Sequence, residues 1–477
     1  MNILLFIKFT MVFFTVKICS AVVRECKTDT FGTNFVFGFI GNKLVLKEEN
    51  IHLHITPILQ QTARVQVTAP FLIVDKTYTI SNFSVITLNG TLIQYENGIQ
   101  FKGIEISSDA NITVTAYNGR GSGNCLDCLE GFLVLPTNAL GTRYITASYV
   151  PHSSFHSEFL VAGVESNTDV VMKISVDGQM SINRTIRLQK FETFQFKSNN
   201  DVTGSIITSN KPVAVFAGSA GTKILIGLGD YQYIVEQMIP TKYWTTKYIV
   251  PPIYLRKYFV LKFFADHDNT EVHYYNSTNH YAVYMDRGSV VETLFGTDPV
   301  TVIANYPIGV MQYGHEGYYN VYGDPIMITA QGVSQFVDSY RFITQSYYST
   351  GSNTLAVTIG KENASKILLN SRSISYWNDK NVSVAYPNGQ YLILFVNVSS
   401  NSSYRLSHSE GVKFGAVLYG SPYSGSAYGY PLQLTMSDSE NCGLSSTSQS
   451  TAPTPGPTDT RYTSKPFQTT NDTGYGK

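Results

Sequence analysis

Charged residues are scarce in this chain. They make up 14% of the 477 residues, whereas about 25% is typical of soluble domains. Basic and acidic residues balance at 34 each, so the chain has no net charge with which to attract phosphates or anionic lipids. Nucleic acid and membrane surfaces are therefore not expected partners. Tryptophan is also rare, with two residues, but the 33 tyrosines and 27 phenylalanines favour β-strands.

The sequence also lacks the motifs of common catalytic sites. It contains no G-x-S-x-G nucleophile elbow, no complete G-x-G-x-x-G, no P-loop and no H-E-x-x-H. A glycoside hydrolase would need two acids across a cleft, and few acids here lie outside expected turns. We therefore expect a protein that binds without catalysing a reaction and without a cofactor.

Long apolar runs are missing after the first residues. Lys8 gives the amino terminus a positive charge, an apolar run follows from Phe9 to Val16, and small residues stand at Ser20 and Ala21. This order is typical of a cleavable signal peptide, and the apolar run is too short to span a bilayer. We expect residues 1–21 to be removed and the mature protein to be secreted, with no transmembrane segment.

Cysteine is used sparingly, and its count fits export. Of the five cysteines, Cys19 falls in the expected signal peptide, which leaves four. Four cysteines allow three pairings. We favour Cys125 with Cys128, and Cys26 with Cys442, because the second bridge would join the start of the folded region to its end. A redox-active or zinc-binding Cys-x-x-Cys is the alternative, and an oxidising compartment disfavours it.

Motifs for asparagine-linked glycosylation are frequent. The chain has ten Asn-x-Ser/Thr sequons, about twice as many as chance would give. We expect them to provide a sugar-coated surface. The sequons begin at Asn82, Asn89, Asn111, Asn183, Asn276, Asn363, Asn381, Asn397, Asn401 and Asn471.

One pattern of two strands recurs four times, at a spacing of about 100 residues. Its copies lie at residues 103–117, 204–218, 300–314 and 404–420. Each copy reads as a strand, a polar turn rich in Asp, Asn or Ser, and an apolar strand. Pro212 and Pro307 stand at the start of the second strand, where a missing N–H is tolerated. A hairpin with an apolar first strand recurs at the same period.

These repeats predict an all-β fold of four modules. The modules would span residues 22–130, 131–232, 233–331 and 332–442. Each would hold six or seven short strands, which is the content of a β-sandwich. A β-propeller with two blades per repeat is the alternative. Residues 443–477 are rich in Ser, Thr, Pro and Gly, and we expect a disordered tail there.

Two clusters have the residue types of metal sites, but we assign no metal to either. His52 and His54 lie on one strand face, a spacing that can hold zinc. Two solvated or hydrogen-bonded side chains are a more frequent reason for such a pair. Residues 266–271 offer oxygen ligands for Ca²⁺, but they fall at the repeated hairpin turn, where Asp and Asn are favoured for backbone reasons.

A glycine-rich loop follows each repeated apolar strand, and the four loops differ in sequence. They lie at residues 119–130, 218–233, 314–325 and 420–431. Equivalent loops leave equivalent corners of a repeated module, so they are candidates for ligand binding. Tyrosine suits protein and sugar surfaces; the alternative is that the rings pack between modules. The candidate binding residues are Asp230, Tyr231, Tyr318, Tyr319, Tyr322, Tyr423 and Tyr428.

Several motifs together carry a family resemblance. They are Gly32–Phe37, Phe132–Pro136, Leu140–Tyr144, Asp201–Gly218, Asp230 with Val235–Gln237, Pro240, Trp244 and Tyr428–Pro431. Through them, residues 30–432 resemble the amino-terminal domain family of the IgGFc-binding protein, a large secreted mucin-like protein. The block Asp201–Gly218 is the most specific of these motifs.

The resemblance implies an extracellular binding or adhesion role without enzyme activity. Two departures limit it: residues 218–229 contain no cysteine, where relatives are expected to have some, and cysteine-dense von Willebrand-type modules are absent. Immunoglobulin binding is therefore not implied. We expect a protein or glycan ligand outside the cell. A structural role in mucus or extracellular matrix is the alternative, and a carbohydrate-active enzyme is less expected.

Overall fold

The computed structural model describes residues 27–42, 49–59, 61–120, 129–225, 231–315, 324–345, 352–386, 389–421 and 427–438. Within these ranges the protein consists of antiparallel β-sheets and short 3₁₀ helices, which confirms the predicted all-β class. No helix in these ranges has the length and apolar character needed to cross a bilayer.

The first sheet is formed around one long strand, β8 (Ile104–Arg120). The other strands are β2 (Gly32–Phe37), β3 (Glu49–Pro57), β4 (Ala63–Ala69), β5 (Val74–Ile80), β6 (Ser84–Asn89) and β9 (Glu130–Val134). The order is β5-β4-β8-β3-β6, and β2 and β9 also pair with β8. In β4 the buried Val65 and Val67 alternate with the exposed Arg64 and Gln66, so the sheet has one apolar face.

The second and third sheets repeat this arrangement. The second contains β7 (Gly98–Gln100), β10 (Gly141–Ile145), β11 (Ser157–Gly163), β12 (Thr168–Val176), β13 (Gln179–Leu188), β14 (Thr193–Ser198), β15 (Ile206–Thr222) and β16 (Gln232–Gln237). The third contains β17 (Thr245–Val250), β18 (Phe259–Ala265), β19 (Thr270–Tyr275), β20 (His280–Met285), β21 (Val290–Phe295), β22 (Val300–Gly314) and β23 (Ile326–Thr329). The long strands β15 and β22 take the place of β8.

The fourth unit has the same strand order, but its long strand is divided in two. Its strands are β24 (Ser339–Ile343), β25 (Ser352–Gly360), β26 (Ile367–Leu369), β27 (Arg372–Ser373), β28 (Asn378–Val384), β29 (Tyr391–Val398), β30 (Ser403–His408), β31 (Gly415–Ser421) and β32 (Tyr428–Pro431). They form the sheets β24-β30-β26-β27 and β28-β29-β25-β31-β32. β30 and β31 together correspond to one long strand of the other units.

Repeated antiparallel sheets of similar size are thus confirmed, with one difference inside them. The first three units are each a single curled sheet, because the polar segment inside the repeat is not a turn. In β15, partners change from β12 at Ser209 to β11 at Val213, and the pairing with β10 shifts in register there. Pro212 has no N–H to pair, so it fits this irregular position in a continuous strand.

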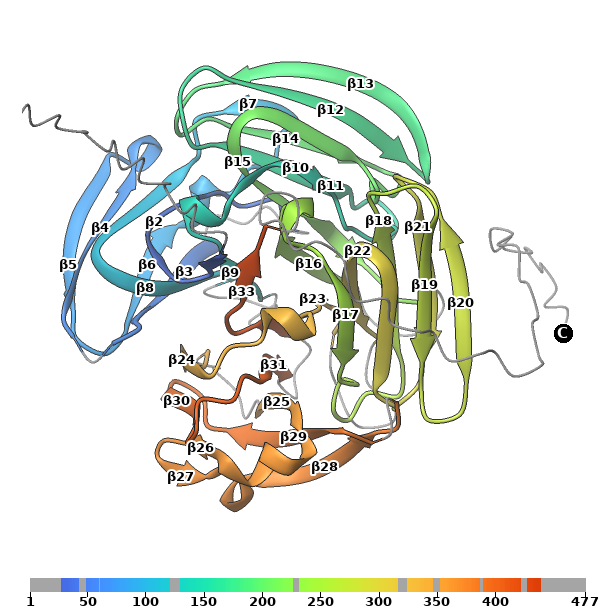
Figure 1. Ribbon diagram of the computed structural model, residues 1–477. Helices are drawn as coiled ribbons and strands as arrows, with labels where there is room; N and C mark the ends of the chain where they lie inside the picture. Colours follow the sequence, from blue (N-terminus) through green and yellow to red (C-terminus); the bar gives the residue numbers. More distant parts are fainter. Residues whose placement is uncertain are drawn as a thin grey trace, which may run out of the picture.

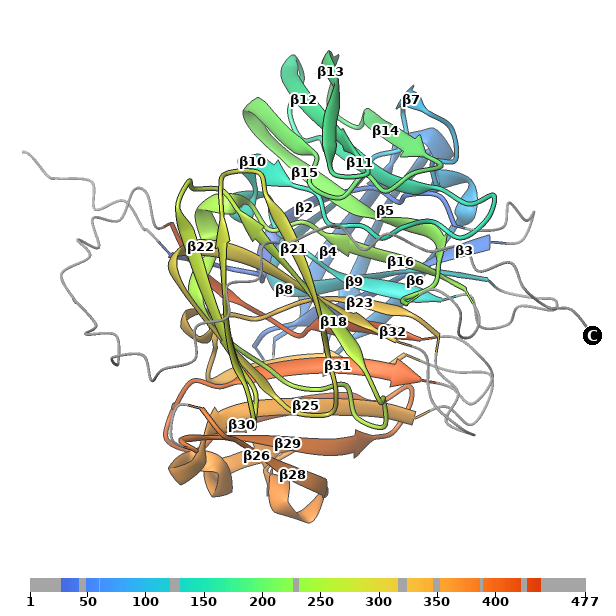
Figure 2. The ribbon, with the colours of Figure 1, turned by 90° about the vertical axis from the view of Figure 1, so that its right-hand side faces the viewer.

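The units surround a central bundle of four strands (Figure 1). β9 and β23 each contact β16 and β32, so the four strands form a closed circle of neighbours in the middle of the molecule (Figure 2). They run in the same direction. Hydrogen bonds at both ends of β9 and β16 illustrate this common direction. At the start of these two strands, Gln232 Nε2 donates to the Leu129 carbonyl at 3.5 Å. At their other end, the Leu135 N–H donates to Gln237 Oε1 at 2.9 Å.

The circle of units is closed by the two ends of the described chain. β1 (Lys27–Asp29) pairs antiparallel with β33 (Thr435–Ser437), so that Lys27 lies opposite Ser437. The N–H of Thr30 donates to the Leu434 carbonyl, and the N–H of Leu434 donates back to Thr30 Oγ1, both at 2.9 Å. Strand pairing therefore joins the first and last units.

Three of the 3₁₀ helices in the described residues mark the end of the molecule where this closure lies. The 3₁₀ helices are η1 (Pro70–Leu72), η2 (Gly90–Leu92), η3 (Thr137–Ala139), η4 (Thr241–Tyr243), η5 (Val333–Gln335), η6 (Lys361–Lys366) and η7 (Ile374–Tyr376). Helices η3, η4 and η5 follow the central strands β9, β16 and β23, and they contact β1 or β33. We call β1, β33, η3, η4 and η5 the closure end.

A buried lysine links the second and third units. Lys262 is 4% exposed, and its Nζ lies 3.3 Å from Asp201 Oδ2 and 3.5 Å from Glu292 Oε2. The same ammonium lies 4.4 Å from the centre of the Tyr149 ring, where a cation–π attraction adds to the ion pairs. Nearby, Arg143 of β10 pairs with Asp266 through two nitrogens. These contacts fix the two units relative to each other.

Candidate functional site

The four predicted binding loops connect each long strand to a central strand. They join β8 to β9, β15 to β16, β22 to β23, and β31 to β32. Because the central strands run in one direction, their first residues gather at one end of the bundle. We call this end, which begins at Glu130, Gln232, Ile326 and Tyr428, the loop end. It lies opposite the closure end.

Most of the candidate residues fall in the inner parts of these loops. Asp230, Tyr318, Tyr319, Tyr322 and Tyr423 lie outside the described residues, as do Cys26, Cys125, Cys128 and Cys442. The structure therefore brings together the attachment points of the loops, and the loop side chains remain a prediction.

Tyr231 is described, and it stands at the loop end just before β16. Its ring stacks on His152, with centroids 5.2 Å apart and planes 7° apart, and it also contacts Phe155 at 4.9 Å. The side chain is 36% exposed. Tyr231 is thus a partly exposed member of an aromatic cluster next to a predicted binding loop.

Tyr428 does not reach the surface. It is fully buried at the start of β32, and its hydroxyl donates to Asn353 Oδ1. Its ring meets Tyr117 of the first unit edge-on, with centroids 5.5 Å apart. The ring packs between the first and fourth units, which was the alternative to ligand contact. We therefore leave Tyr428 out of the candidate site.

A buried acid lies directly beneath the loop end. Glu130 is fully buried, and its Oε1 accepts the N–H of Gly429 at 3.2 Å and that of Gly131 at 3.3 Å. Burial raises the pKa of Glu130 well above its usual value. Asn118 lies opposite it on β8, and in the part of the chain that the structure describes neither Glu130 Oε2 nor the Asn118 amide has a hydrogen-bond partner. Without exposed surface, Glu130 holds strands together and does not meet a ligand.

A second acid occupies the same bundle. Glu236 of β16 is 2% exposed and accepts the N–H of Thr329 at 3.1 Å, which joins the second and third units. Burial raises its pKa as well. We predicted a role for neither Glu130 nor Glu236. The available signal was an acid inside an apolar run, because a charge in a buried strand requires partners or neutralisation.

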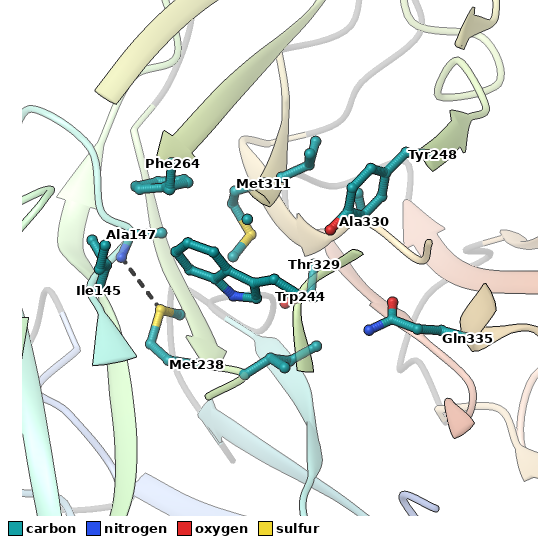
Figure 3. A pocket seen from close by; sticks show the side chains of 13 residues that line it. Ile145, Ala147, Met238, Trp244, Tyr248, Phe264, Met311, Thr329, Ala330 and Gln335 are labelled. Carbon is teal, nitrogen blue, oxygen red and sulfur yellow. Dashed lines mark hydrogen bonds between the residues drawn. The ribbon is translucent and has the colours of Figure 1, made fainter. Parts of the chain in front are cut away.

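The two interior cavities at the unit boundaries are too small for a sugar or a peptide. The larger, about 30 Å³, lies between the second and third units and is lined by Trp244, Met238 and Met311 among others (Figure 3). Its volume fits roughly one water molecule. The other, about 10 Å³, lies between the third and fourth units. Neither of these two cavities has room for a larger ligand.

An open groove of about 330 Å³ lies at the closure end, between β1, the start of β2 and η3. Its volume is at the lower limit of known small-molecule sites. No predicted loop borders it. Its lining is mostly polar.

In both clusters with metal-site residue types, side chains are engaged by other protein groups. His54 is 2% exposed, its ring packs on Tyr117, and burial lowers its pKa to about 3, so it is neutral. In the other cluster, Asp266 is committed to Arg143 and Asp268 accepts the N–H of Arg287 across the hairpin. Among the described residues, no three His, Cys, Asp or Glu side chains are placed to share a metal ion.

The sequence profile of the family described as "IgGFc binding protein" matches residues 130–420. The chain belongs to this family. The matched range starts at β9 and ends in β31, so it includes most of the second unit, the third and most of the fourth. The first unit precedes the match except for β9, yet its sheet has the same strand order as the units inside the match.

A human relative named "IgGFc-binding protein" is 27% identical over 252 residues. The alignment covers 50% of this chain but only 4% of the human protein, so the chain corresponds to a small part of that protein's length. Functions of the whole human protein therefore do not transfer by this alignment.

Comparison with solved structures gives weak similarities to two bacterial adhesins. One is a Ca²⁺-stabilized adhesin with which an Antarctic bacterium binds ice: 11% identity, 86% of this chain, 99% of that chain, TM-score 0.11. The other is a 1.5-MDa bacterial ice-binding adhesin: 7% identity, 64% of this chain, 97% of that chain, TM-score 0.11. At these TM-scores neither similarity bears on fold or function.

Proposed function

We propose that this member of the IgGFc-binding family is a secreted, non-enzymatic recognition protein whose four loops bind a protein or glycan outside the cell. The observation that carries the proposal is the convergence of the four loop attachment points at one end of a closed bundle. A rigid scaffold that presents several different loops together is the usual design of a binding surface.

The surroundings of the sequons support an extracellular, glycosylated protein. Nine of the ten sequon asparagines lie in the described residues: seven are exposed and two, Asn276 and Asn363, are partly exposed. None is buried, as attachment of a bulky sugar requires. Asn471 lies outside the described residues.

The closure end supports the proposed bridge between Cys26 and Cys442. Lys27 and Ser437 are paired residues of β1 and β33, so the backbone next to Cys26 runs beside the segment that leads to Cys442. The bridge between Cys125 and Cys128 would close a small loop between β8 and β9. Peptide mapping of the secreted protein without reduction would identify both pairs, and any crossed pair would contradict this assignment.

The name of the human relative raises immunoglobulin as a ligand, but we do not include it in the proposal. The chain aligns with 4% of that protein, at 27% identity. A binding property of so long a protein could belong to any part of it. The ligand must be found by experiment.

The decisive experiment replaces the tyrosines of the third loop. The purified mature protein is applied to glycan and extracellular-protein arrays, and the variant Tyr318→Ala/Tyr319→Ala/Tyr322→Ala is compared with it. We expect the variant to lose at least tenfold in affinity for the ligand found, while its circular dichroism stays unchanged. The matched control is Tyr281→Ala/Tyr284→Ala/Tyr306→Ala, which changes three exposed tyrosines on β20 and β22 of the third sheet, outside the four loops.

The control separates recognition by the loops from nonspecific binding by exposed tyrosine side chains. Equal losses in both triple variants, or full binding by the loop variant, would refute the proposed site. Multimers in sedimentation together with no saturable ligand on either array would favour the structural role in mucus or matrix.

A further inference from the structure

The groove at the closure end has the chemistry of a saccharide site. Its walls carry the amides of Asn34, Asn111 and Asn138, the carboxylate of Asp29 and the hydroxyl of Thr137. The amides can donate to and accept from sugar hydroxyl and acetamido groups, and the carboxylate can accept from them. Phe31 adds an apolar surface for a sugar ring.

Charge argues against an anionic ligand in this groove. Of the described residues that line it, Lys27 is the one with a cationic side chain, and Asp29 lies two residues away with the opposite charge. Among the described residues, the buried hydroxyl oxygen of Thr28, another lining residue, has no hydrogen-bond partner. A neutral ligand rich in hydroxyl groups fits these walls better than a phosphate or an apolar molecule.

One wall of the groove is itself a sequon. Asn111 is exposed, and it begins the sequence Asn-Ile-Thr inside β8. A sugar attached to Asn111 Nδ2 would therefore start at the wall of the groove. By contrast, the sequon asparagine Asn82 is exposed in the turn between β5 and β6 and lines none of the cavities described above.

We propose that the N-glycan on Asn111 folds into this groove and that its first two N-acetylglucosamine residues bind Asp29, Asn34 and Asn138. Attachment follows the ordinary transfer from a lipid diphosphate oligosaccharide. The anomeric carbon forms a bond to Asn111 Nδ2, its bond to the diphosphate oxygen breaks, and Nδ2 loses a proton.

The glycan would act as a clamp on the closure. β1 is three residues long, and within the described ranges its one strand partner is β33. Asp29 belongs to β1, Asn34 to β2 and Asn138 to η3. A saccharide that contacts all three side chains ties β1 to two elements with which it shares no strand pairing.

The test uses the protein secreted from eukaryotic cells, with Asn82 as the matched site. Glycopeptide mass spectrometry first measures occupancy at both sequons. Native protein is then treated with a peptide-N-glycosidase, and release is followed at each site. We expect the Asn111 glycan to be released at least tenfold more slowly than the Asn82 glycan, with the difference abolished by denaturation.

Two variants test the clamp. Asn138→Ala should leave occupancy at Asn111 unchanged and speed release there to the rate at Asn82. Asn111→Gln should lower Tm by about 2 °C relative to Asn82→Gln, because the clamp is lost with the glycan. An unmodified Asn111 beside an occupied Asn82, or equal release rates in the native protein, would overturn the proposal. The release assay decides even if Asn111→Gln fails to fold.

Discussion

Glu130 accepts a hydrogen bond at 3.2 Å from the backbone N–H of Gly429, 299 residues further along the chain. This contact joins the first central strand to the last, so it helps close the circle of units at the loop end. The same carboxylate oxygen also accepts the N–H of Gly131. One buried side chain therefore supports two backbone groups that water cannot reach.

Replacing Glu130 tests this role. Glu130→Ala leaves two buried N–H groups without an acceptor, and we expect a loss of about 2–4 kcal/mol in the free energy of unfolding. Glu130→Gln keeps an acceptor oxygen and should be at least as stable as the wild type at pH 8. Guanidinium denaturation of all three proteins measures the order. A Gln variant as unstable as the Ala variant would contradict the hydrogen-bonding role.

The buried carboxyl group of Glu158 predicts how the free energy of unfolding depends on pH. This residue of β11 is 1% exposed, and burial raises its pKa well above the usual value. The folded state therefore holds the proton more tightly than the unfolded state, whose pKa is about 4.3. The contribution of this group to stability is complete below that pKa and is lost as the pH rises towards the folded pKa.

Glu158→Gln should remove this pH dependence, because an amide does not ionise. We expect the Tm of the variant to match the wild type near pH 4 and to exceed it increasingly towards pH 8, by about 2 °C or more. Differential scanning calorimetry across that range measures the difference. A constant offset at every pH would show that Glu158 is not a buried titrating group.

The contacts of Lys262 predict how much this side chain stabilises the junction between the second and third units. Lys262→Met leaves Asp201 and Glu292 without their shared cation, and we expect a loss of about 3 kcal/mol in unfolding free energy. The control is Lys173→Met, an exposed position where the change should stay within about 0.5 kcal/mol. Thermal and guanidinium unfolding compare the two. Equal effects would mean that the buried ion pairs contribute nothing specific.

The surroundings of Gly218 predict that β15 tolerates no side chain at this position. A Cβ at this position in β15 would lie 1.9 Å from the carbonyl oxygen of Ile234 in β16. The obstacle is backbone, so Gly218→Ala should cost about 3 kcal/mol or more. At Gly296 a Cβ would meet nothing within 4 Å, and Gly296→Ala should be close to neutral. Similar stabilities of the two variants would refute the steric argument.

The sequence predicted the repeated units because strand patterning is local. Alternation of Val65 and Val67 with polar neighbours, and its counterparts at the same period, needs no knowledge of distant contacts. The polar segment around Pro212 was misinterpreted as a turn for the same reason. Proline has no N–H, so it does not fit a regularly paired position of a strand. It fits a register shift within one strand as well as it fits a turn.

The candidate site was harder to predict, because its distinguishing feature is the meeting of segments far apart in the chain. The sequence placed tyrosines in loops but could not show that Tyr428 turns inwards against Tyr117. The Thr329 partner of Glu236 lies 93 residues away, and no local pattern reports such a pairing. Charges within apolar runs were the one signal that pointed to these buried contacts.

The antiparallel pairing of β1 with β33 also determines how the molecule responds to a pulling force. Lys27 and Ser437 are opposite each other at the outer edge of the pair. Tension applied through the two chain ends would load that edge first and unzip the strands one hydrogen bond after another, instead of shearing all of them at once. A covalent link between Cys26 and Cys442 would carry this load in place of the β1–β33 hydrogen bonds. The remaining circle of sheets would then be unstrained.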